Sequence, residues 1–193
     1  GIKRRVLPEV DDDLAQKAGG FESVAQMREA VVNSYTESRQ QLYRADAQKK
    51  LIDSLLKQVD FELPEAMVEN HLQRLIGELE SRLERQGKSM ASLGKSQEDL
   101  RAEFLSQAED MARSEVFLLA VAKDQEMEVS EREFDYYFQQ LAARTNQDFI
   151  QLKKYHIDNN LMPAVRDRLL ADKATEFLYN KAEIIHVPAE AEG

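Results

Sequence analysis

The three histidines have the widest chemical scope in this chain, because histidine can transfer protons or ligate a metal near neutral pH. His71 and His156 have no histidine or glutamate three or four residues away, the spacing at which two ligands share one helix face. His186 lies in residues 183–187, whose β-branched side chains predict an extended segment. We therefore expect no catalytic residue and no metal at these positions.

Two Gly-Lys-Ser triplets, at 87–89 and 94–96, resemble part of a phosphate-binding loop. Such a loop needs a glycine five positions before its second glycine, where this chain has Ser89, and it needs a preceding strand. A helix end and a turn explain both triplets. The acidic residues Asp11–Asp13 are explained as a helix cap and partners of the helix dipole. No nucleotide, cofactor or metal is therefore expected. An enzyme would need a set of catalytic side chains, and no such set is recognisable in this sequence.

The composition predicts an all-α protein. The chain has 193 residues but only 7 glycines and 4 prolines, too few for the turns of a β-rich fold. The absence of cysteine excludes disulfides and fits a reducing cytosol. A net charge of -10 disfavours contact with nucleic acid, and Lys3-Arg4-Arg5 is the only basic cluster. No apolar stretch reaches the roughly 18 residues of a membrane span, so a membrane is not an expected partner.

The run from Ser23 to Val59 contains no glycine or proline, and its apolar residues recur at helical spacing. A helix of this length, at about 1.5 Å per residue, measures roughly 55 Å. A compact domain of this size has a radius of gyration of only about 16 Å. The run therefore predicts an elongated multi-helix body with protruding arms, in which the apolar stripe forms a packed spine.

The remaining helices are marked by caps and breakers. Gly19 and Gly20 end a first short helix, and Ser96 with Asp99 forms a capping box. The segment Lys88–Lys95 is the turn of a helical hairpin, which we interpret as an arm. The predicted helices are Asp12–Ala18, Pro64–Gly87, one from Ser96, one from Ser130, one near Asp148–Ile157, and Leu161–Lys181.

Several motifs, taken together in order and spacing, resemble the carboxy-terminal chaperone domain of the bacterial trigger factor family. They are Arg4-Arg5-Val6-Leu7-Pro8-Glu9, Gly20-Phe21-Glu22-Ser23-Val24, Phe61-Glu62-Leu63-Pro64-Glu65, Val129-Ser130-Glu131 and Ala171-Asp172-Lys173-Ala174. The resemblance implies a helical cradle that holds nascent or unfolded polypeptide without ATP. It also implies a cytoplasmic location and a role of the intact protein in folding and protein export.

The resemblance also sets the expected domain limits. Residues 1–10 form an extended linker at the end of a missing isomerase domain, and residues 11–188 form the helical chaperone domain. Within it, arm 1 covers about 64–126, and the body and arm 2 cover about 127–182; residues 189–193 are a frayed tail. The family's peptidyl-prolyl isomerase and ribosome-docking domains are missing, so this chain itself should show no isomerase activity and no direct ribosome contact.

A further helical segment of the family's domain, from before the isomerase, is also missing. Its absence is expected to leave an apolar groove on the body, and a second copy of the chain, as a homodimer, is one way to cover that groove.

Five residues are the predicted client contacts: Phe134, Tyr137 and Leu141 on one helix, and Leu152 and Tyr155 on the next. Amphipathic tyrosines suit promiscuous binding of apolar segments. The competing interpretation is that Phe134 and Leu141 only pack these helices together. Two other functions stay open: a helical scaffold for a single folded partner, and a periplasmic chaperone domain of similar shape.

Overall fold

The computed structural model describes residues 10–183 and residue 185. The predicted linker at 1–10, apart from Val10, and the predicted tail at 189–193 lie outside the described residues, as do the basic cluster at 3–5 and His186. The chain divides into two compact units, residues 1–49 and 50–193, which are described separately.

The first unit contains helix α1, Asp12–Gly19, and the beginning of helix α2, Val24–Leu56. Asp11 caps α1 as predicted, because its carboxylate accepts a hydrogen bond from the Leu14 amide at 2.8 Å. Gly20 ends α1 in the left-handed conformation with a φ of 71°. Asp12 accepts a hydrogen bond from the Val24 amide at 2.8 Å, which joins α1 to the start of α2.

The apolar stripe of α2 is exposed along the first unit. Three of its side chains, Val31, Tyr35 and Leu42, are 61% to 69% exposed, and Val32 and Tyr43 beside the stripe are also exposed. The long helix is therefore confirmed, but the prediction that its stripe is a packed spine is wrong for this stretch. Periodicity shows that a helix has an apolar face; it does not show that a neighbour in the same chain covers that face.

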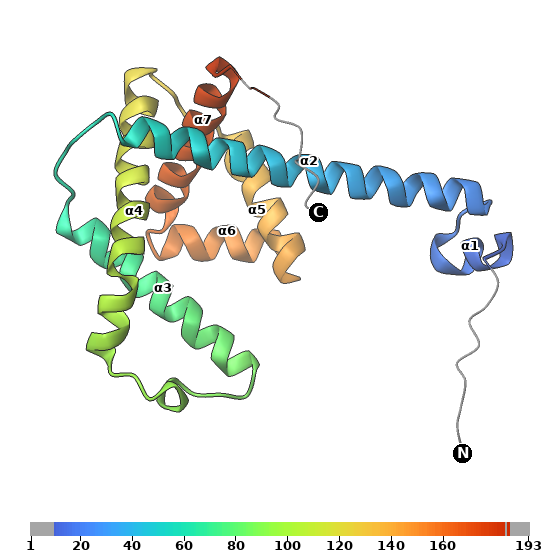
Figure 1. The fold of residues 1–193 in the computed structure, drawn as a ribbon, viewed down its shortest axis with the longest axis horizontal. Helices are drawn as coiled ribbons and strands as arrows, with labels where there is room; N and C mark the ends of the chain where they lie inside the picture. Colours follow the sequence, from blue (N-terminus) through green and yellow to red (C-terminus); the bar gives the residue numbers. More distant parts are fainter. Residues whose placement is uncertain (1–9, 184, 186–193) are drawn as a thin grey trace, which may run out of the picture. The chain divides into compact units, whose positions relative to one another are not determined.

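The second unit contains the end of α2 and the remaining helices (Figure 1). These are α3, Glu65–Arg85; the 3₁₀ helix η1, Met90–Leu93; α4, Gln97–Asp124; α5, Glu131–Thr145; α6, Phe149–Asp158; and α7, Met162–Lys181. The predicted all-α class is confirmed, with no strand among the described residues. Pro64 precedes α3 as its N-cap residue instead of lying in the first turn, and η1 interrupts the predicted tip turn.

Three apolar clusters hold the second unit together. The hairpin cluster lies between α3 and α4 around Leu72, Leu75 and Ala108. The junction cluster joins the end of α2 to α4 and α7 around Ile52, Leu118, Ala122 and Ala174. The α5 cluster joins α5 to α7 around Phe134, Phe138 and Val165. Helix α7 thus contributes to two clusters, and it packs against α4 in one and against α5 in the other.

The α3–α4 hairpin, in which the two helices cross and contact each other (Figure 1), also has a partly buried polar contact. His71 is buried, and its Nε2 lies 2.6 Å from a carboxylate oxygen of Glu115. Arg74 donates to His71 Nδ1 at 2.9 Å. Because arginine can only donate, Nδ1 is the accepting nitrogen and Nε2 carries the proton toward Glu115.

Candidate functional site

Helix α5 begins at a capping box that involves both the backbone and the side chains. Ser130 is the N-cap residue, and its hydroxyl accepts a hydrogen bond from the Glu133 amide at 3.4 Å. Glu133 reaches back with Oε2, which accepts hydrogen bonds from the Ser130 amide and hydroxyl, each at 2.7 Å. The backbone N–H groups of Ser130 and Glu133, which have no partner within the helix, are thereby both hydrogen-bonded. The predicted helix start at Ser130 is confirmed.

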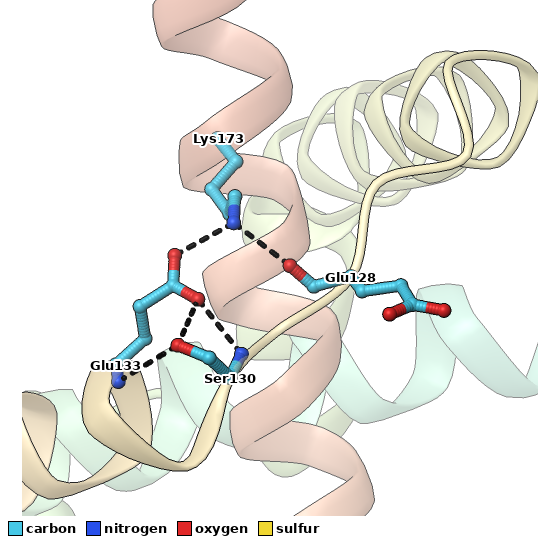
Figure 2. A network of polar contacts seen from close by, with 4 residues as sticks. All are labelled: Glu128, Ser130, Glu133 and Lys173. Atoms are coloured by element: carbon cyan, nitrogen blue, oxygen red, sulfur yellow. Dashed lines mark hydrogen bonds and ion pairs between the residues drawn. The ribbon is translucent and has the colours of Figure 1, made fainter.

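Lys173 on α7 binds the other side of the same carboxylate, as Figure 2 shows. Its Nζ donates to Glu133 Oε1 at 2.6 Å and to the Glu128 backbone carbonyl at 2.7 Å. We call Lys173, Glu128, Ser130 and Glu133 the Lys173 clamp. The hydrogen bond from Lys173, followed by those from Ser130, lowers the pKa of Glu133 from its ordinary 4.5 to about 2.

The clamp borders a hollow of about 610 Å³ between α5 and α7. Most of the exposed surface inside this α5–α7 hollow is apolar, with the charged groups among its lining residues. The lining residues are Arg132, Glu133 and Tyr136 of α5, and Leu169, Asp172, Lys173, Glu176, Phe177 and Asn180 of α7. A hollow of this size and character is large enough for several apolar side chains of a bound polypeptide.

Asp172 lies in this hollow beside the clamp. The surrounding protein removes part of its hydration and raises its pKa above the ordinary value, and the charge of Arg168 opposes this effect. Two separate sequence motifs, Val129-Ser130-Glu131 and Ala171-Asp172-Lys173-Ala174, are therefore linked through Glu133, which bonds both Ser130 and Lys173.

Four of the five predicted contact residues lie in or against the α5 cluster. Phe134 belongs to its buried centre, and Tyr137, Leu141 and Leu152 pack against that centre while half-buried. Tyr155 differs, because it is 58% exposed on α6. The structure thus brings Phe134, Tyr137, Leu141 and Leu152 together as helix packing, and it leaves Tyr155 available at the surface. A role of these five residues in binding a client stays a prediction.

The packing of α6 explains this division. His156 contacts the ring of Phe138 edge to face, with centroids 4.9 Å apart, and Nδ1 of His156 donates to the Leu152 carbonyl at 2.8 Å. Lys153 donates to Asp135 of α5 at 2.6 Å. One face of α6 therefore packs against α5.

The outward side of α6 carries apolar residues that the sequence reasoning missed. Ile150 is 71% exposed and Ile157 is 55% exposed. A separation of seven residues places the two on one helix face. Their spacing was a usable signal, but the sequence did not show which face of so short a helix would be covered.

The part of the chain that the structure describes contains neither a metal-binding cluster nor a membrane-spanning helix. Among the described residues, no group of three histidine, aspartate or glutamate side chains could hold a metal ion. No helix among them combines the length and the apolar character needed to cross a bilayer. The exposed apolar residues and the α5–α7 hollow are therefore the surface that a function has to explain.

Comparison with known proteins agrees with the fold and with the motifs at the clamp. The family profile described as "Bacterial trigger factor protein (TF) C-terminus" matches residues 23–180. The chain belongs to the trigger factor family. The peptidyl-prolyl isomerase of trigger factor is in a separate region of the whole protein, and this chain matches the carboxy-terminal region.

Individual relatives give the same result. A trigger factor of Nitratidesulfovibrio vulgaris (strain DSM 19637 / Miyazaki F) is 53% identical over 190 residues, which cover 98% of this chain and 44% of the relative. A trigger factor of Oleidesulfovibrio alaskensis is 52% identical over 191 residues, with 99% and 44% covered. The chain therefore spans less than half the length of these trigger factors.

A solved structure shares the fold. It is described as "Promiscuous Substrate Recognition in Folding and Assembly Activities of the Trigger Factor Chaperone". The similarity has a TM-score of 0.54 at 23% identity and covers 93% of this chain and 44% of that one.

Proposed function

We propose that this chain is an ATP-independent chaperone domain that holds unfolded polypeptide through dispersed apolar patches. The observation that carries the proposal is the exposure of large apolar side chains on separate elements of one chain. They include Val31, Tyr35 and Leu42 on α2, Tyr136 on α5, and Ile150, Tyr155 and Ile157 on α6. Exposed apolar surface beyond single scattered residues marks an interaction site.

Dispersed patches suit an unfolded client better than a folded one. An unfolded chain offers apolar residues at irregular intervals, and several weak contacts along it reinforce one another through effective concentration. Each contact alone breaks readily, so the client can leave without nucleotide hydrolysis. Membership of the trigger factor family supports this function, and the solved relative is itself described as a chaperone with promiscuous substrate recognition.

The proposal places nascent or unfolded polypeptide as the partner and the cytoplasm as the location. Contact with the ribosome and isomerase activity would then belong to other regions of the whole protein, because the chain spans 44% of the relatives it matches. The predicted homodimer and the cradle shape stay part of this proposal.

The first experiment is suppression of aggregation of a chemically denatured protein by this chain without ATP. We expect substoichiometric to equimolar amounts of the chain to lower the light scattering of several unrelated clients. A helical scaffold for one folded partner would instead leave all of them unaffected and bind one protein in a saturable one-to-one complex. That second result would replace the chaperone proposal.

The outward face of α6 can be tested directly. The double substitution Ile150→Ser with Ile157→Ser should weaken binding of an unfolded client several-fold and leave the melting temperature almost unchanged, because both side chains are exposed. Gln151→Ser with Lys154→Ser is the matched control, since it shortens exposed side chains of the same helix without removing an apolar contact. Equal client binding by the two double variants would remove α6 from the binding surface.

A further inference from the structure

We propose that Lys173 is a positioning residue whose charge keeps the α5–α7 hollow in its binding geometry. This inference rests on the proposed chaperone function for its binding consequence, but its structural consequence can be measured without any client. It goes beyond helix packing because it assigns to one cation the spacing of two helices on either side of a hollow.

The geometry of the clamp carries the first step. Glu133 uses Oε2 to close the capping box with Ser130 and Oε1 to receive Lys173, so one carboxylate fixes the start of α5 and its attachment to α7. Lys173 also donates to the Glu128 carbonyl, which lies before the N-cap. A single ammonium group therefore holds both the entering chain and the first turn of α5. Hydrogen bonds between charged groups are shorter and stronger than neutral ones.

The surroundings of the clamp carry the second step. Glu133 and Lys173 line the hollow themselves, and Tyr136 and Phe177 follow them by three and four residues on their own helices. The spacing between the two helices at the clamp therefore sets the distance between these aromatic side chains.

The remaining contact between α5 and α7 is limited. It is concentrated in the α5 cluster around Phe134 and Val165. The apolar cluster can keep the helices attached after the clamp is lost, but of its residues only Leu169 borders the hollow. Loss of the Lys173 charge should consequently loosen the hollow while the fold persists.

The test compares two lysines of similar exposure that each pair with a glutamate. The side chain of Lys173 is 38% exposed, and that of Lys95, which lies 2.5 Å from Glu103 near the hairpin tip, is 46% exposed. The variants are Lys173→Met and, as the matched control, Lys95→Met. Glu133→Gln is a second clamp variant, because glutamine can still accept in a capping box while its charge is gone. Lys173→Arg keeps the charge and serves as the rescue variant.

The structural readout is the distance distribution between spin labels on α5 and α7. The chain contains no cysteine, so spin labels on Gln140→Cys and Asn180→Cys attach at these two positions without any native cysteine having to be removed first. Lys173→Met and Glu133→Gln should broaden this distribution or shift it, Lys173→Arg should restore part of it, and Lys95→Met should leave it unchanged. An unchanged distribution in both clamp variants would overturn the inference.

The binding readout uses a permanently unfolded probe, a reduced and carboxymethylated protein carrying a fluorophore. We expect Lys173→Met to bind it about three- to tenfold more weakly, a modest effect because solvent screens the partly exposed pair, with Lys95→Met at wild-type affinity. Wild-type affinity in Lys173→Met would refute the role of the clamp in binding. Absence of binding by the unsubstituted chain would instead refute the chaperone proposal, and the spin-label result would still decide the clamp. If Lys173→Met does not fold, Glu133→Gln decides both readouts.

Discussion

Glu133 combines two tasks that proteins often give to separate residues. Its backbone and side chain complete a helix cap, and the same side chain forms an ion pair with another helix. Both sets of partners favour the ionised carboxylate, and together they lower its pKa to about 2. A group whose pKa is lowered on folding contributes stability above its unfolded pKa and loses that contribution as the pH falls through its folded pKa.

The sign of this linkage predicts an acid-dependent difference between the unsubstituted chain and Glu133→Gln. The unsubstituted chain should be more stable at pH 5 to 7, and the advantage should shrink as the pH falls from the ordinary 4.5 toward about 2. Urea denaturation of both proteins across this range measures the difference in the free energy of unfolding. The advantage should be modest, because the glutamate side chain is 38% exposed and solvent screens the pair.

Glu131→Gln provides the control for this prediction. Glu131 lies in the same first turn and is 3.5 Å from Lys153, but it is almost fully exposed. Its substitution should leave the acid dependence of stability close to that of the unsubstituted chain. A stability difference for Glu133→Gln that stays constant from pH 7 to pH 2.5 would contradict the assigned ionisation.

The α3–α4 hairpin allows a buried polar residue to be compared with an exposed ion pair. His71→Ala removes the partner of both Glu115 and Arg74 and leaves a gap between the helices, so we expect a loss of about 1–3 kcal/mol in the free energy of unfolding. Chemical denaturation followed by circular dichroism measures it.

The exposed pair in the same hairpin is the comparison for His71→Ala. Arg101 binds Glu69 through two nitrogens, at 2.9 Å and 2.5 Å, and its hydrogen bond lowers the pKa of Glu69 to about 2. Arg101→Ala should nevertheless destabilise the hairpin less than His71→Ala, because solvent screens a surface pair. The reverse order would mean that the buried histidine contributes little to the hairpin.

At this scale the sequence allowed accurate predictions wherever a local signal decides the outcome. Ser96 with Asp99 forms the predicted capping box, and α6 begins at Phe149, near the predicted start. The individual contact residues could not be predicted in the same way. Tyr137 and Leu141 have the same character as exposed residues of α6, and only the tertiary packing of α5 on α7 separates them.

Leucines in the apolar clusters and leucines on the exposed stretch of α2 should differ in how much stability is lost when they are replaced by alanine. Leu72 is 2% exposed in the hairpin cluster, so Leu72→Ala should cost about 2–5 kcal/mol. Leu42 is largely exposed on α2, so Leu42→Ala should change stability by no more than about 0.5 kcal/mol. Thermal and urea denaturation of the two variants compare them directly. Similar losses would mean that the stripe of α2 is covered in solution.

The fold class of the whole molecule was predictable because the scarcity of glycine and proline and the long apolar periodicities point to the same architecture. The burial of α2 was not predictable, since the same periodicity fits a stripe that faces the rest of the chain and one that faces solvent. The pairing of Lys173 with Glu133 could not be predicted from the sequence either. Forty residues separate them, and each occupies an ordinary helical position until α7 packs against α5.

The hairpin cluster has a consequence for how this chain folds. All its apolar residues come from two consecutive helices, so its contacts join neighbouring elements of the chain. Helical proteins whose contacts join neighbouring elements fold in about microseconds to milliseconds. A protein that captures unfolded chains is exposed, just after synthesis, to capture by its own finished copies. Under the proposed chaperone function, rapid closure of the hairpin would bury its leucines before such an encounter, and a newly made molecule would pass quickly from potential client to chaperone.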